Sequence, residues 1–171
     1  MLKNIDAYRQ IAAEVDFPLH LGVTEAGTFA SSAVASSIAL GTLLLEGIGD
    51  TVRVSVTGTP EEEITIARNI LSALHLRSFG PRIVACPTCG RTRVDLIGTC
   101  RQVEERLKGC TKDIKIAVMG CAVNGPGEAR DADIGLAGGV DEFLLFAHGE
   151  IIRKIPAADA VDELISEIEK L

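Results

Sequence analysis

Apolar and polar residues alternate with two different periods in the first half of the chain, and together they predict helices interleaved with strands. The helix period of three or four residues occurs in 5–15 and 33–46, and the strand period of two occurs in 19–23 and 51–57. A third helix is expected from Thr59 to about His75, because Thr59 precedes a proline and stands three residues before a glutamate. Strands separated by helices predict a parallel α/β layer.

The pattern changes after Arg-Ser-Phe-Gly-Pro at 77–81, which we interpret as the boundary between two domains, 1–80 and 81–171. The second domain is expected to hold strands at 82–85 and 113–119, a helix at 99–108, and a hairpin of 142–147 and 150–155 around His148-Gly149. A last helix should begin near Pro156 and place one apolar face toward the core, formed by Val161, Leu164, Ile165, Ile168 and Leu171.

Composition predicts a folded chain, since 47% of the 171 residues are hydrophobic and 24% are charged. The net charge of −7 argues against a general nucleic-acid or anionic-membrane surface. The most apolar stretch, 33–45, is shorter than the roughly 20 residues that a membrane span needs, and we expect no secretory signal. Five cysteines in such a chain indicate a reducing compartment, the cytoplasm, and metal or redox use in place of disulfides.

Three of these cysteines stand where predicted strands end. Cys86 and Cys89 form a C-x-x-C loop directly after one strand, and Cys121 ends another strand 32 residues later. Two strand ends can bring three thiolates together, and the turn-forming residues before Glu128 can fold its carboxylate back to the same point. The sequence therefore predicts a metal site of three sulfurs and one oxygen.

The C-x-x-C spacing alone is shared by zinc ribbons, thioredoxin-like loops and iron-sulfur sites. Structural zinc normally needs a fourth Cys or His, for which Cys110 and His148 are the candidates, and it would make the chain a zinc-stabilised, non-catalytic binding module with Glu128 as a surface acid. Soft thiolates in a reducing compartment fit an iron-sulfur cluster better. Cys100 and Cys110 are expected to be packing residues.

Polar residues on the first-domain strands are candidates for binding an anionic substrate. On strand 51–57 the valines share one face, so Arg53 and Ser55 share the other, which points inward if the strand belongs to a barrel. A guanidinium and a hydroxyl suit a diphosphate, and the alternative is an arginine that forms a salt bridge within the core. Glu25 follows its strand and is a candidate acid-base residue or a helix N-terminal acid, while Arg91 and Asn124 lie beside the predicted ligands.

Long stretches of the chain resemble one enzyme family. Cys-Pro-Thr-Cys-Gly-Arg at 86–91 and Gly-Cys-Ala-Val-Asn-Gly-Pro-Gly-Glu at 120–128 resemble the cluster signature of the 4-hydroxy-3-methylbut-2-enyl diphosphate synthases, iron-sulfur enzymes of the methylerythritol phosphate isoprenoid pathway. Segments 18–27 and 47–55 resemble the last strands of that family's barrel. The resemblance covers the whole chain in order.

The resemblance implies a fold of the last two βα units of a TIM-type barrel, followed by a small α/β iron-sulfur domain. It implies a 4Fe-4S cluster held by Cys86, Cys89, Cys121 and Glu128. A carboxylate is displaced from iron more easily than a thiolate, so Glu128 would mark the iron that opens to substrate. It also assigns a diphosphate-binding role to the strand of Arg53 and an acid-base role to Glu25; Arg91 and Asn124 are candidate substrate contacts.

The activity implied by the resemblance is the reductive ring opening and dehydroxylation of 2-C-methyl-D-erythritol 2,4-cyclodiphosphate. Its implied partners are ferredoxin or flavodoxin as electron donor and a second copy, in a homodimer whose cluster domain closes the partner's barrel. Two departures stand out: Ala35 occupies a position where family members often carry lysine, and the chain holds only two barrel strands. We therefore expect the chain alone to bind a cluster without turning over substrate.

Overall fold

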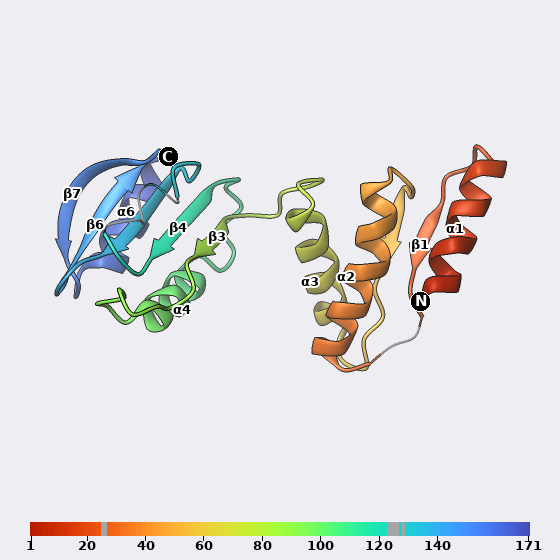
Figure 1. The fold of residues 1–171 in the computed structure, drawn as a ribbon, viewed down its shortest axis with the longest axis horizontal. Helices are drawn as coiled ribbons and strands as arrows, with labels where there is room; N and C mark the ends of the chain where they lie inside the picture. Colours follow the sequence, from red (N-terminus) through yellow and green to blue (C-terminus); the bar gives the residue numbers. More distant parts are fainter. Residues whose placement is uncertain (25–26, 123–126, 128) are drawn as a thin grey trace. The chain divides into compact units, whose positions relative to one another are not determined.

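The computed structural model describes residues 1–24, 27–122, 127 and 129–171. They form two compact units, Met1–Ser78 and Phe79–Leu171, each with its own core (Figure 1). Both units mix helices with strands, which confirms the α/β class. No helix in the described part of the chain has the length and apolar character needed to cross a membrane.

The first unit alternates three helices with two short strands, as the periods predicted. Its elements are α1 (Leu2–Glu14), β1 (His20–Gly22), α2 (Phe29–Leu45), β2 (Thr51–Arg53) and α3 (Pro60–Ala73). β1 and β2 pair in parallel, with His20 opposite Thr51 and Gly22 opposite Arg53. The helices pack against one face of this pair through a cluster of buried aliphatic residues that includes Leu21, Leu40, Leu43, Val54 and Ile66.

Local chemistry explains where the elements around β2 begin and end. The predicted capping box at the start of α3 is present: the Glu62 N–H donates to Thr59 Oγ1 at 3.4 Å, and the Glu62 carboxylate accepts from the Thr59 N–H at 2.8 Å. The strand predicted to reach residue 57 ends at Arg53, because later amides bond outside the ladder. The Val56 N–H donates to Glu63 and the Thr57 N–H to the Gly27 carbonyl.

The second unit is built on a five-stranded sheet of order β3-β4-β5-β6-β7. Its elements are β3 (Arg82–Ala85), α4 (Leu96–Arg106), β4 (Lys115–Met119), β5 (Ile134–Gly138), β6 (Glu142–Ala147), β7 (Glu150–Pro156) and α6 (Ala160–Lys170). The strands β3, β4 and β5 run parallel, and the predicted hairpin of β6 and β7 adds two antiparallel strands.

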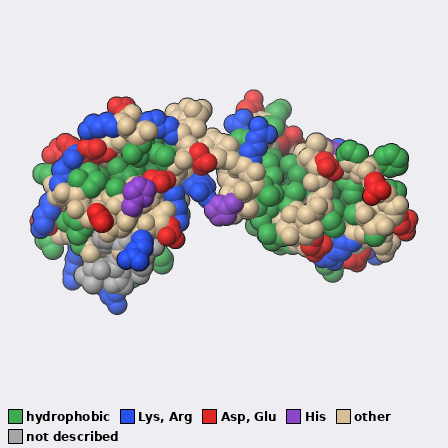
Figure 2. All heavy atoms as spheres, turned by 90° about the horizontal axis from the view of Figure 1, so that it is seen from above, with side chains coloured by type: hydrophobic (Ala, Val, Ile, Leu, Met, Phe, Trp, Pro, Cys, Tyr) green, Lys and Arg blue, Asp and Glu red, His purple; other side chains and the backbone are tan. Residues whose placement is uncertain are grey.

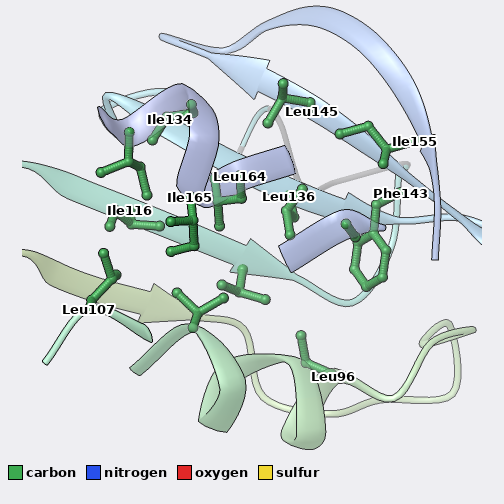
Figure 3. Packing of buried hydrophobic residues seen from close by; sticks show 14 residues of the cluster. Leu96, Leu107, Ile116, Ile134, Leu136, Phe143, Leu145, Ile155, Leu164 and Ile165 are labelled. Atoms are coloured by element: carbon green, nitrogen blue, oxygen red, sulfur yellow. The ribbon is translucent and has the colours of Figure 1, made fainter. Parts of the chain in front are cut away.

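Both faces of the central strands β4, β5 and β6 are buried. α4 and α6 pack on one face around residues such as Leu136, Leu145 and Leu164, which are fully buried (Figure 3). The other face carries a smaller cluster of alanines with Met119, Leu144 and Phe146. The carboxyl end of β4 therefore leaves a core that is buried on both faces, and the carboxyl end of the edge strand β3 lies beside it.

Three sequence predictions for this unit were wrong at the element ends. α4 begins at Leu96, three residues before the predicted start, because the Asp95 carboxylate accepts from the Gly98 N–H at 2.9 Å and caps the helix. The last helix begins at Ala160 because Pro156 still pairs with β6. Leu171 is 64% exposed, so the apolar face of α6 ends at Ile168.

Candidate functional site

The carboxyl ends of β3 and β4 place two of the predicted ligand cysteines side by side. Cys86 follows β3 directly, Cys121 follows β4 by two residues, and the strands are parallel neighbours with Ala85 opposite Val118. The Gly120 N–H donates to Cys86 Sγ at 3.1 Å. The Cys86 sulfur therefore lies against the backbone that carries Cys121.

A reciprocal turn holds the third cysteine in the loop after β3. The exposed Cys89 donates its N–H to Thr92 Oγ1 at 3.2 Å, and the Thr92 N–H donates to the Cys89 carbonyl at 3.0 Å. A Cβ atom at Gly120 would lie 2.8 Å from Thr92 Oγ1, so this loop packs directly on the end of β4. Sequence reasoning missed Thr92, although a hydroxyl residue three positions after Cys89 is a signal for such a turn.

The donor chemistry at this edge fits an iron-sulfur cluster. All five cysteines are free thiols, and the Cys86 sulfur receives an amide N–H, as thiolates that hold a cluster commonly do. Within the described ranges, no three His, Cys, Asp or Glu side chains converge closely enough to hold a metal ion. Glu128 and Asn124, the predicted fourth ligand and its neighbour, lie outside the described residues.

Cys100 and Cys110 occupy packing positions, as expected. Both are half-buried against the core formed by α4, α6 and the sheet. Burial raises the pKa of the Cys100 thiol, and the nearby Glu104 and Cys86 raise that pKa further. The Cys100 thiol therefore resists ionisation, whereas a cysteine that binds metal does so as the thiolate.

A basic pocket of about 310 Å³ adjoins Cys121. It lies at the ends of β4 and β5 and is lined by Gly90, Arg91, Arg93, Cys121, Ala122, Gly138, Gly139 and Val140. A Cβ at Gly138 would lie 2.5 Å from Val94 Cγ2 and 2.9 Å from the Gly120 carbonyl oxygen, so the loop and both strand ends are in close contact. Arg91, a predicted substrate contact, is exposed at this pocket; Arg93 was not predicted.

In the first unit, Arg53 and the valines of its strand lie on opposite faces. Val52 and Val54 pack into the core with the helices, whereas Arg53 is exposed and its Nε lies 3.6 Å from the place of a Cβ at Gly22. Arg53 makes no ion pair with the residues that the structure describes. Its guanidinium is therefore available on the face away from the helices, and the half-buried Ser55 follows on the same segment.

Glu25 itself lies outside the described residues, but the chain that follows it is well anchored. The Gly27 N–H donates to the hydroxyl of the buried Ser32 at 2.9 Å, and the Gly27 carbonyl accepts from the Thr57 N–H at 2.8 Å. Glu63 Oε1 accepts from the Val56 N–H at 3.0 Å. These bonds join the segments that follow β1 and β2, and Ser32 and Glu63 were not identified from the sequence.

Comparison with known proteins matches both units in order. Residues 1–68 match the GcpE TIM-barrel domain, and residues 82–170 match the GcpE protein C-terminal domain. These matches cover both the barrel strands and the cysteine loops. The resemblance inferred from the cysteine motifs is thereby confirmed.

Three bacterial relatives, each named 4-hydroxy-3-methylbut-2-en-1-yl diphosphate synthase (flavodoxin), align along nearly the whole chain. That of Geobacter sulfurreducens is 54% identical over 169 residues, that of Clostridium acetobutylicum 56% over 167, and that of Caldicellulosiruptor saccharolyticus 53% over 171. The alignments cover 99%, 98% and 100% of this chain but 48%, 48% and 49% of the relatives, so the chain spans about half of their length. On the strength of both domain matches, the chain belongs to the GcpE family.

Proposed function

We propose that the chain acts as part of a 4-hydroxy-3-methylbut-2-en-1-yl diphosphate synthase, with 81–171 as its cluster domain and 1–80 as the last two βα units of its barrel. The reaction is the reductive ring opening and dehydroxylation of 2-C-methyl-D-erythritol 2,4-cyclodiphosphate in isoprenoid biosynthesis. The observation that carries this proposal is the position of the motif cysteines at the ends of adjacent parallel strands, in a chain 54% identical to a relative of that name.

The cofactor in this proposal is a 4Fe-4S cluster held by Cys86, Cys89, Cys121 and Glu128. The neighbouring strand ends and the N–H donated to Cys86 support it. When bound, the cluster supplies single electrons and an iron with an exchangeable ligand. Glu128 is suited to be that ligand because a carboxylate binds iron less tightly than a thiolate does.

The side chains of this protein bind and orient the substrate. Arg53 and Ser55 hold its diphosphate, and the exposed guanidinium of Arg53 beside Gly22 supports this role. Glu25 holds or moves a proton at the carboxyl end of its strand. Arg91 and Asn124 contact the substrate or orient the cluster, as the position of Arg91 beside Cys121 suggests.

The proposed partners are an electron donor and a second copy of the chain. Relatives are named for flavodoxin, which supports a flavodoxin donor here, with ferredoxin as the alternative. A homodimer follows from the resemblance. The free cysteines support a reducing, cytoplasmic location.

Anaerobic reconstitution with iron and sulfide tests the cofactor. We expect brown protein that contains iron and sulfide in equal amounts. Replacement of Cys86, Cys89 or Cys121 by Ser should abolish the colour, Glu128→Gln should leave a labile cluster, and the control Cys100→Ser should retain it. Colourless protein with one bound zinc, or bleaching by Cys100→Ser but not by Cys121→Ser, would overturn the proposal.

Substrate binding is tested after the remaining barrel strands are supplied by co-expression. Arg53→Ala should weaken binding of the cyclic diphosphate, whereas Glu25→Gln should slow turnover more than binding. Arg9→Ala is the matched control, because Arg9 on α1 is exposed and pairs with Glu46, which follows α2 directly. Unchanged affinity in the Arg53 variant would refute the assigned strand face.

An assay of the isolated chain, without the co-expressed strands, tests whether it is active alone. A (β/α)₈ barrel closes with eight strands, and the described part of the first unit has two. The isolated chain should therefore bind a cluster but form no product with a chemical reductant. Steady product formation by the isolated chain would contradict this expectation.

A further inference from the structure

The pocket beside Cys121 carries positive charge on a chain that is acidic overall. Arg91 and Arg93 are both exposed and line it, and none of the described residues that line it is acidic, whereas the whole chain has a net charge of −7. Neither guanidinium has an ion-pair partner among the residues that the structure describes. In Figure 2 basic side chains border the lower end of the unit on the left, which is the second unit.

The backbone of this basic loop is held in place while its two arginines face solvent. Thr92, which stands between them, is bonded to Cys89, and Val94 packs against Gly138. The cap that Asp95 forms on α4 fixes the end of the loop. Two exposed positive side chains on an anchored backbone, beside a candidate cluster ligand, are suited to recognise a surface of opposite charge.

We propose that Arg93 and Val140, on the rim of the pocket that Arg91 also lines, form the docking surface for the electron-donor protein, a flavodoxin that presents acidic side chains to this rim. This inference rests on the proposed function, because only a bound cluster requires a donor. Positive charge steers an acidic partner and speeds the encounter. Val140, 74% exposed, adds an apolar contact of the kind that small, transient redox interfaces use.

The lining of the pocket favours a protein face over the diphosphate of the substrate. A diphosphate site needs converging donors, yet the lining residues that the structure describes carry no hydroxyl side chain, and the Gly139 N–H already donates to the Glu142 carbonyl at 2.7 Å. The rim is also apolar at Val140. An exposed mixture of arginine and an apolar residue is typical of protein interfaces.

The test measures calorimetric binding of oxidised flavodoxin to the cluster-loaded chain under anaerobic conditions. Affinity should fall as NaCl rises from about 50 to about 500 mM, because salt screens exposed charges. Arg93→Glu should weaken binding about fivefold. Arg93→Gln and Val140→Ser should each weaken it by about the square root of that factor, roughly twofold. Lys108→Glu, the same charge change at a side chain 72% exposed beyond the far end of α4, should change affinity less than about twofold.

The outcomes separate this inference from the proposed function. The docking surface alone would be overturned if the brown, cluster-loaded chain did not bind flavodoxin. It would also be overturned if Lys108→Glu and Arg93→Glu lowered the affinity for flavodoxin equally. If Arg93→Glu lowers affinity for the cyclic diphosphate and leaves flavodoxin binding unchanged, the pocket belongs to the substrate and the inference is wrong. Failure of the unmodified chain to take up iron refutes the proposed function instead.

Discussion

A methyl group added at Gly120 should disrupt the contact between the C-x-x-C loop and the end of β4. Gly120 is buried, and a Cβ there would lie 2.8 Å from Thr92 Oγ1 and 3.2 Å from Leu96 Cδ2. Overpacking of this kind costs about 1–3 kcal/mol, and the smaller backbone entropy of an unfolded alanine offsets about 0.4–1 kcal/mol of it. Gly120→Ala should therefore lower the free energy of unfolding of the second unit by roughly 1–2 kcal/mol.

A double-mutant cycle tests whether this contact is the cause. Thr92→Ala removes both Thr92 atoms that the new methyl group would meet, so the double variant should recover part of the loss, with a coupling of about 1 kcal/mol. Thr92→Ala alone removes the acceptor for the exposed Cys89 N–H, which water can replace, at a cost of about 0.5–1 kcal/mol.

The assay is urea denaturation of the reduced, metal-free chain, followed by near-UV and far-UV circular dichroism. Gly90→Ala is the matched control, since a Cβ at Gly90 has no atom within 4 Å. We expect the control to unfold at the same urea concentration as the unmodified chain. If Gly120→Ala matches Gly90→Ala in stability, or if its effect adds simply to that of Thr92→Ala, the packing of the loop on β4 is refuted.

Three further predictions follow from single residues. Leu136→Ala, in the core of the second unit, should cost about 2–5 kcal/mol in urea denaturation, while Val140→Ala should stay within about 0.5 kcal/mol; similar values for both would contradict the core. Thr59→Ala should destabilise the first unit by about 1 kcal/mol through loss of the helix cap, and an unchanged transition would refute the cap. Because burial raises the pKa of Cys100, its alkylation should begin at higher pH than that of exposed Cys89, as mass spectrometry can measure; equal rates would contradict this.

Elements with strong local signals could be predicted from the sequence. The capping box at Thr59 fixed the start of α3, and strand 82–85 was predicted with the bounds that β3 has. β5 was missed, because all five of its residues are buried and three of them are glycine or alanine, so no alternation of polar and apolar positions marks it. Alternation of polar and apolar residues marks strands that expose one face to solvent, and β5 exposes neither face.

The candidate site likewise has parts that local sequence indicates and parts that only the fold brings together. The C-x-x-C loop and Cys121 are local motifs at strand ends, so the sequence indicated them directly. The contacts of Thr92 with Gly120 and of Val94 with Gly138 depend on the order of the sheet, which brings the ends of β4 and β5 under the loop. Arg93 could not be identified from the sequence, because only the folded sheet forms the pocket that it lines.

The two units differ in how completely their own residues cover their apolar surface. The second unit buries both faces of the three central strands of its sheet, β4, β5 and β6. The first unit has strands of three residues each, and its 17-residue α2 has no charged residue yet leaves Val34, Ile38 and Leu45 between 50% and 76% exposed. A two-stranded sheet is marginally stable, and an uncharged helix is typical of one that packs on several sides. The ends of β3 and β4, where Cys86 and Cys121 lie, therefore adjoin a core that is buried on both faces of its central strands, whereas the strand that carries Arg53 belongs to a two-stranded sheet whose covering helix leaves apolar side chains exposed.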